Sequence, residues 1–211
     1  MKHNFLPLLC FCFYFFHASA ATTTSDMETT KISRKPTPYI EAKAGYFFFV
    51  TSPMSDVYNQ GGLDVQISGA YPVARYLRAY GSVEYFNKSG RSLKGNQHTS
   101  IWAVPFSLGI QPVVYLNSAD TLTYYVTLGP RYFLTRAHNN STYVSEHIRS
   151  NGWGAFANTG FTITLYNHLK LDFFGEYSYG RLHYKSTIPN SQGSHAQISG
   201  LTFGGGLSYA F

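Results

Sequence analysis

Residues 198–211, ISGLTFGGGLSYAF, decide the fold. The large apolar side chains fall on one parity, together with Gly205: Leu201, Phe203, Leu207, Tyr209 and Phe211. The other parity is small or polar: Gly200, Thr202, Gly204, Gly206, Ser208 and Ala210. Successive side chains of a strand point to opposite faces of the sheet. The pattern therefore predicts a β-strand with one apolar face and one small, polar face.

The same alternation recurs in seven earlier segments, so eight strands are predicted. Their ranges are Tyr39–Val50, Leu63–Tyr71, Tyr76–Phe86, Ile101–Val113, Leu122–Thr135, Gly152–Leu165, His168–Gly180 and Ile198–Phe211. All charged residues inside these segments lie on the polar parity: Glu41, Lys43, Asp64, Arg78, Glu84, Arg131, Lys170, Asp172 and Glu176. A charge on a lipid-facing strand surface costs about 2–4 kcal/mol at mid-membrane. This segregation favours an all-β fold, an eight-stranded antiparallel up-and-down transmembrane β-barrel.

Composition supports a barrel in lipid over a soluble one. Only 12% of the 211 residues are charged and 18% are aromatic, whereas soluble proteins carry about 25% charged residues. No apolar run of ~18 residues occurs after the N-terminus, and only helices and closed sheets satisfy their backbone groups in lipid. A soluble lipocalin-type barrel would need a solvated exterior. The fourth, sixth and eighth segments carry no charge on either face, which disfavours that alternative.

The N-terminal region divides into two further segments. Residues 1–20 have a basic start, an apolar stretch and a small-residue end at Ala18-Ser19-Ala20, as in a secretory signal peptide. Residues 21–36 are Thr-rich and predict a disordered periplasmic linker, leaving 37–211 as the barrel domain. Both cysteines, Cys10 and Cys12, fall in the signal peptide, so the mature chain is expected to hold no disulfide or thiolate site. Its modest positive charge is not gathered into a stripe, which argues against nucleic acid as a partner.

Connection lengths alternate along the chain. The predicted gaps 51–62, 87–100, 136–151 and 181–197 are long, and the gaps 72–75, 115–121 and 166–167 are short. Outer-membrane barrels have long extracellular loops and short periplasmic turns. The even strand number places both termini in the periplasm. Pro105 and Pro130 fall inside predicted strands, where each is expected to mark a bulge or a shifted register.

These features together resemble the small outer-membrane barrel families: the membrane domain of OmpA, OmpX and the opacity-type surface proteins. The resemblance covers residues 37–211 and includes YYVTLGPRYF at 124–133 and LSYAF at 207–211. It implies an outer-membrane location reached through the signal peptide. It also implies that Tyr209 and Phe211 form the insertion signal read by the barrel-assembly machinery.

The predicted lumen is filled by side chains, because eight strands enclose a space just wide enough for them. Five acidic and four basic inward residues nearly cancel. We expect a plug of ion pairs, for example Glu41 or Asp172 against Arg78 or Arg131. The expected network comprises Glu41, Lys43, Asp64, Arg78, Glu84, Arg131, Asp172 and Glu176. A narrow pore for small solutes is the alternative.

Basic residues dominate the predicted extracellular loops. They are Lys88, Arg91, Lys94, Arg136, Arg149, Arg181 and Lys185, against Asp56 and Glu146. Such a rim is expected to contact anionic lipopolysaccharide or acidic host glycans, although ordinary solvation of loop tips accounts for it equally well. Function in rigid scaffolds is often carried by loops.

Candidate catalytic and metal sites are weak. Ser141 lies near His138, and Glu146 precedes His147, but the spacing does not match the His-x-Ser pattern of lipid A deacylase barrels. Five histidines fall in the predicted loops: His98, His138, His147, His183 and His195. No pair has the spacing of metal ligands. We therefore expect no catalytic residue, metal or cofactor.

The function predicted from the sequence is that of a non-enzymatic outer-membrane surface barrel. Its loops would contact lipopolysaccharide or a host or environmental ligand, serving envelope integrity or adhesion. A narrow solute pore and a lipid A-modifying enzyme are the alternatives.

Replacing the terminal aromatic tests the insertion signal. Phe211→Ala is expected to leave most of the protein as a degraded periplasmic intermediate, because the assembly machinery would lose the residue that it reads. Phe203→Ala, on the same face of the same strand, serves as the control and should insert. Heat-modifiable mobility in outer-membrane fractions measures both, and normal insertion of Phe211→Ala would contradict the assignment.

Overall fold

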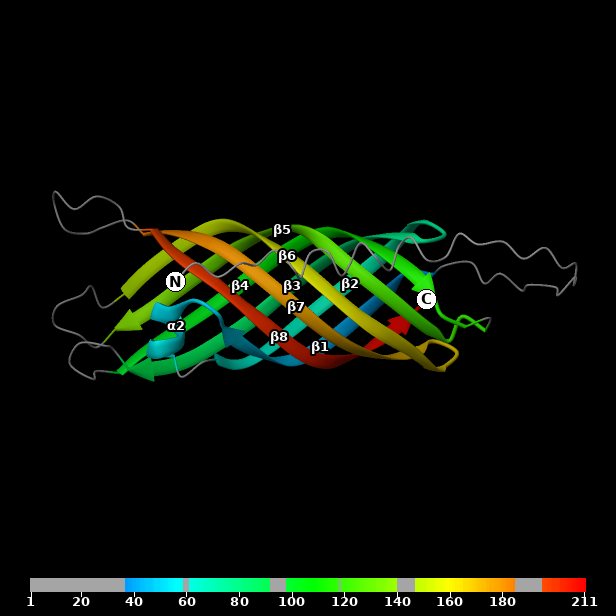
Figure 1. Cartoon of the computed structure of the whole chain (residues 1–211), viewed down its shortest axis with the longest axis horizontal. Helices are drawn as coiled ribbons and strands as arrows, with labels where there is room; N and C mark the ends of the chain where they lie inside the picture. Colours follow the sequence, from blue (N-terminus) through cyan, green and yellow to red (C-terminus); the bar gives the residue numbers. More distant parts are fainter. Residues whose placement is uncertain (1–36, 59–60, 92–97, 118, 140–146, 185–194) are drawn as a thin grey trace, which may run out of the picture. The chain divides into compact units, whose positions relative to one another are not determined.

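Eight antiparallel strands close into a barrel in the order β1 to β8, with β8 paired to β1 (Figure 1). The structure is a computed structural model and describes residues 37–58, 61–91, 98–117, 119–139, 147–184 and 195–211. The strands are β1 (Tyr39–Phe49), β2 (Gly61–Ala74), β3 (Leu77–Arg91), β4 (His98–Tyr115), β5 (Leu122–Asn139), β6 (His147–Tyr166), β7 (Leu169–Tyr184) and β8 (His195–Ala210). The predicted fold class is confirmed. The signal peptide and linker, residues 1–36, lie outside the described residues.

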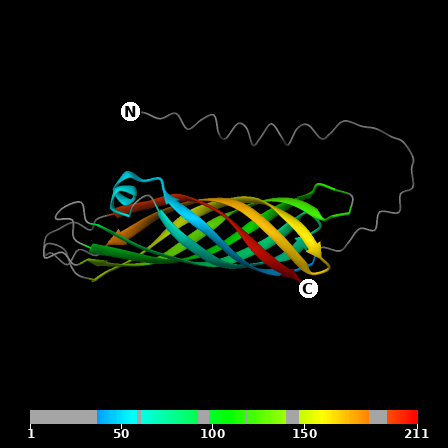
Figure 2. The ribbon, with the colours of Figure 1, turned by 90° about the horizontal axis from the view of Figure 1, so that it is seen from below.

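A short helix, α2 (Ser52–Val57), follows β1 and marks one end of the barrel, called here the α2 end (Figures 1 and 2). It occupies part of the gap that was predicted to be a loop. Pro53 lies in its first turn, where the missing N–H has no intrahelical partner to lose. The opposite end, where short connections join β2 to β3, β4 to β5 and β6 to β7, is called here the turn end. The C-terminus lies there, and Phe211 N donates to Pro38 O (3.0 Å). Among the described residues, no helix is long and apolar enough to cross a membrane.

Most of the strands run further toward the α2 end than the sequence predicted. β3 extends to Arg91 and β4 begins at His98, so part of the predicted loop 87–100 is strand. In the same way, the ends of β5 and β6 occupy part of 136–151, and those of β7 and β8 part of 181–197. The connections at the turn end are short, as predicted.

The expectation of bulges at Pro105 and Pro130 is wrong. Pro105 stands opposite Phe133 and Pro130 opposite Ala155, and the registers on both sides of each proline are continuous. The β3–β4 ladder omits only the pairs at Pro105 and its neighbour Val104, and the β4–β5 ladder omits those at Pro130 and Gly129 and those at Pro112 and Gln111. The missing N–H groups thus interrupt hydrogen bonding locally without displacing the strands. The registers shift instead at 72–74 and 164–166, both near turns.

The predicted parity is confirmed along the barrel wall. The inward residues of β1 to β3 are buried or half-buried, whereas the outward ones, including Ile67, Leu63 and Tyr71, are largely exposed. Large apolar side chains form this exterior on every strand, which is the surface of a barrel that faces lipid. The tyrosines and tryptophans that lie near the ends of the predicted strands are also exposed: Tyr46, Tyr71, Tyr85, Trp102, Trp153, Tyr177, Tyr179 and Tyr209.

Two glycines differ in how much space the neighbouring strand would leave for a side chain. A Cβ at Gly129 on β5 would lie 1.9 Å from the Leu108 carbonyl oxygen on β4. A Cβ at Gly81 on β3 would meet nothing nearer than Leu108 Cδ2, at 3.6 Å. Gly129→Ala should therefore lower the free energy of unfolding by about 1–3 kcal/mol, and Gly81→Ala should not. Urea unfolding in detergent compares the two, and equal midpoints would contradict this account of the wall.

Candidate functional site

Lys43 organises the first of two charged clusters in the lumen. Its Nζ lies 3.1 Å from Glu41 Oε2 and 3.1 Å from Asp172 Oδ2. Tyr125 links the cluster, because it accepts from Lys43 Nζ (3.1 Å) and donates to Asp172 Oδ2 (2.8 Å). The ammonium also lies 4.7 Å from the centre of the Phe174 ring. One cation is thus enclosed by two carboxylates and an aromatic face, as buried charges require.

Arg131 organises the second cluster in the same way. Its guanidinium contacts Glu84 and lies 2.7 Å from Glu176 Oε1. Its remaining donors reach Ser107 Oγ (2.8 Å) and Ser178 Oγ (2.9 Å). Arg131 is among the largest fully buried side chains of the described chain. The arrangement again sets one cation against two carboxylates.

The example pairings predicted from the sequence differ from those in the structure. Glu41 and Asp172 pair with Lys43, not with an arginine. Arg78 makes no ion pair within the described residues: it donates weakly to Gln111 Oε1 (3.5 Å) and lies over the Tyr39 ring. Asp64 is buried in the lumen but likewise has no ion pair among the described residues. The structure therefore brings six of the eight predicted network residues into direct ion pairs.

An apolar cluster that was not predicted from the sequence fills the lumen at the α2 end. Its buried members are Phe49, Tyr58, Phe86, Ile101, Ala103, Phe133, Leu182 and Ile198. Met54 and Val57 of α2 pack against it. Burial raises the pKa of the Tyr58 phenol, so the hydroxyl stays neutral. The signal in the sequence was a run of apolar residues on the inward parity near one end of the strands.

The basic residues predicted to lie in loops are mostly on strands. Lys88 and Arg91 lie on β3, Arg136 on β5, Arg149 on β6 and Arg181 on β7, all toward the α2 end. Lys94 and Lys185 lie outside the described residues, as do Ser141 and Glu146. The arginines have the outward parity, whereas Lys88 has the inward one, next to Gly62.

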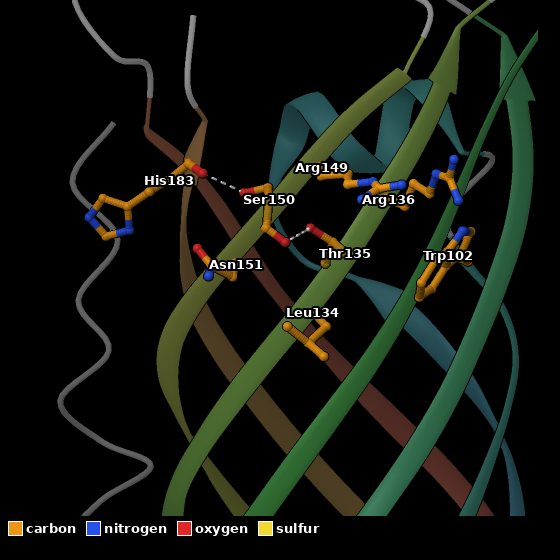
Figure 3. A pocket seen from close by; sticks show the side chains of 8 residues that line it. All are labelled: Trp102, Leu134, Thr135, Arg136, Arg149, Ser150, Asn151 and His183. Carbon is orange, nitrogen blue, oxygen red and sulfur yellow. Dashed lines mark hydrogen bonds between the residues drawn. The ribbon is translucent and has the colours of Figure 1, made fainter.

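Two of these arginines line an open cleft on the outer wall (Figure 3). The cleft has a volume of about 470 Å³. Its lining residues come from β4, β5, β6 and β7: Trp102, Leu134, Thr135, Arg136, Arg149, Ser150, Asn151 and His183. Two hydrogen bonds fix its backbone: Ser150 Oγ donates to the His183 carbonyl (2.7 Å), and Thr135 Oγ1 donates to the Ser150 carbonyl (3.0 Å).

The predicted loop histidines also lie on strands. His98, His138 and His183 belong to β4, β5 and β7, while His147 and His195 begin β6 and β8. Among the described residues, no group of three His, Cys, Asp or Glu side chains is placed to hold a metal ion.

Comparison with known proteins shows the fold. No protein-family model and no curated protein matches the sequence. Solved structures that resemble it include OprG of Pseudomonas aeruginosa, at 12% identity over 84% of this chain and 99% of that one, with a TM-score of 0.56. The outer-membrane protein AlkL is 15% identical over 90% of this chain and 97% of AlkL, with a TM-score of 0.54. Ail of Yersinia pestis, solved with the heparin analogue sucrose octasulfate, is 10% identical over 83% and 100%, with a TM-score of 0.50. The chain therefore shares the eight-stranded fold of small outer-membrane barrels.

Removing the central guanidinium tests the lumen network. Arg131→Ala would leave Glu84 and Glu176 buried without their cation, which is expected to cost about 3–5 kcal/mol of stability. Arg78→Ala removes another buried arginine, one that makes no ion pair within the described chain, so its cost should be clearly smaller. Thermal unfolding in detergent measures both variants. Equal melting temperatures for the two would contradict a special role for the Arg131 cluster.

Proposed function

We propose that the chain is a non-enzymatic outer-membrane surface barrel with a side-chain-plugged lumen. Its α2 end would contact lipopolysaccharide or a host or environmental ligand, in envelope integrity or adhesion. The observation that carries the proposal is the filling of the lumen by the Lys43 cluster, the Arg131 cluster and the apolar cluster. A filled lumen leaves the surface at the α2 end as the part that can meet a ligand.

Three features of the lumen support its closure. The two ion-pair clusters consist of buried side chains that hold one another by direct contacts. The apolar cluster next to α2 contains Leu182 with no exposed surface. A hydrated ion crossing the barrel would have to break charged contacts and then cross an apolar layer.

The described residues offer no support for acyl transfer. Such chemistry needs a nucleophile held by a base and an acid that orients the base. Ser150 and His183 are neighbours in the outer cleft, but the serine hydroxyl donates to the histidine backbone carbonyl. That hydrogen bond directs the proton of Ser150 away from any ring nitrogen.

The charge at the α2 end favours an anionic partner. Arg91, Arg136, Arg149 and Arg181 all lie on outward positions near this end. No acidic residue occupies an outward strand position within the described chain. Summed charge of one sign raises the local concentration of ligands of the opposite sign. Ail, a barrel of the same fold, was solved with the polyanion sucrose octasulfate.

Conductance in planar bilayers distinguishes the proposal from a pore. The wild-type barrel is expected to give no discrete current steps, because its lumen is filled. A large general porin, added afterwards to the same bilayer, should conduct and shows that the bilayer is competent. Regular unitary steps from the wild-type protein would instead assign the function to a solute pore.

Enzymatic activity is tested on cells that express the barrel, and ligand contact is tested on the purified barrel. Lipid A extracted from these cells should have the same mass as lipid A from cells with an empty vector. The purified barrel should bind lipopolysaccharide or an acidic glycan, and a variant in which Arg91, Arg136, Arg149 and Arg181 are all replaced by alanine should lose most of that binding. A new mass for lipid A would identify an enzyme.

A further inference from the structure

Arg136 and Arg149 stand directly opposite each other on the outer wall. The register of β5 and β6 pairs Arg136 with Arg149, and the register of β4 and β5 pairs Trp102 with Arg136. Both arginines have the outward parity, and Figure 3 shows their side chains side by side in the cleft. The barrel thus presents two guanidinium groups at one point of its side.

Such a pair is unfavourable without an anion. Like charges directly opposite on one face of a sheet repel each other. Neither arginine has an ion pair with a carboxylate among the described residues. A bound anion would remove the repulsion, and planar guanidinium groups match the oxygens of phosphate in a bidentate manner.

The surroundings indicate an amphipathic ligand. The cleft combines the two cations with Trp102 and Leu134. Asn151 lies between the arginines and the aromatic pair of Tyr132 and Trp153, and its Nδ2 donates to Tyr132 Oη (2.9 Å). The anion-binding groups therefore lie beside apolar side chains that continue down the wall.

The height of the pair matches the headgroup layer of a membrane. The rings of Tyr132 and Trp153 make a tilted contact with their centres 5.0 Å apart, on the same two strands and four residues from Arg136 and Arg149 toward the turn end. Tyrosine and tryptophan at such positions mark the boundary of the hydrocarbon region. Four residues of strand span about 13 Å, and the strands tilt by about 40°. The arginines therefore stand roughly 10 Å beyond the Tyr132–Trp153 pair, at the level of Trp102 on β4.

We propose that Arg136 and Arg149 clamp a phosphate of a phosphorylated glycolipid of the outer leaflet, of the lipid A class. This proposal rests on the proposed function and names one ligand for it. The guanidinium groups bind the phosphate, and an acyl chain lies along Leu134 and the wall below. A membrane lipid fits better than a soluble polyanion, because the cations face sideways from the wall next to apolar side chains.

Fluorescence of Trp102 measures the interaction. The chain has two tryptophans, Trp102 and Trp153, so a Trp153→Phe background leaves one reporter, inside the cleft. The folded barrel in detergent is titrated with bis-phosphorylated lipid A, with dephosphorylated lipid A and with sucrose octasulfate. Heat-modifiable mobility confirms that each variant is folded.

The charge-matched variants decide the assignment. Arg136→Ala/Arg149→Ala should weaken binding of bis-phosphorylated lipid A roughly tenfold or more. Arg75→Ala/Lys170→Ala removes the same number of cations at the turn end of the barrel and should leave binding unchanged. Arg136→Lys/Arg149→Lys keeps the charge without the planar fork and should give intermediate binding. Dephosphorylated lipid A should bind all variants equally weakly.

Three outcomes would overturn the site. These are equal binding of both lipid A forms, equal losses in the two double alanine variants, and sucrose octasulfate binding to the pair as tightly as lipid A does. The last result would assign the pair to a soluble polyanion. If lipid A binds but independently of the pair, only the arginine site fails, and the proposed surface function stands. Current steps in the bilayer assay would overturn the proposed function instead.

Discussion

The structure depends on the pairing of β8 with β1. This ladder runs from Tyr39–Ala210 to Phe49–Gly200 and removes the two free edges that eight strands would otherwise leave. In lipid no water is present to satisfy unpaired N–H and C=O groups, so an open edge would be very costly. Closure also sets the circumference, and eight strands leave only enough room for side chains. The filled lumen is thus a consequence of closure.

The glycines of β8 show how tightly closure constrains the lumen. A Cβ at Gly206 would lie 2.8 Å from Lys43 Cγ, and one at Gly200 would lie 2.2 Å from the Phe47 ring. The face of β8 with small side chains therefore leaves space for Lys43 and, nearer the α2 end, for the Phe47 ring. Gly206, the neighbour of Lys43 across the ladder, leaves free the space that the stem of Lys43 occupies while its ammonium pairs with Glu41 and Asp172.

The sequence predicted which residues face outward and which face the lumen better than it predicted the contacts across the lumen. Alternation with a period of two fixes which face each residue takes, and this held for all eight strands. The partner of Arg131 depends on the stagger of distant strands: Glu84 lies on β3 and Glu176 on β7. No local pattern encodes that stagger, so the example pairings with Arg78 and Arg131 failed. The predicted strands stop short of the outward arginines, whereas the observed strands include them: Arg91, Arg136, Arg149 and Arg181.

Along these strands the outward side chains change from apolar to cationic toward the α2 end, and this change has a physical cause. In the part of the wall that faces lipid, apolar side chains such as Phe161 and Leu128 point outward and charged side chains such as Arg131 point inward. Toward the α2 end the same strands turn apolar side chains such as Leu182 inward, while cations face outward. A wall in lipid requires the first arrangement, and a wall in a polar layer requires the second. The reversal on β5 and β6 falls between the Tyr132–Trp153 pair and the Arg136–Arg149 pair. The arginine pair thus stands at the first level where the barrel wall is built for polar surroundings, where the charged groups of lipid headgroups also lie.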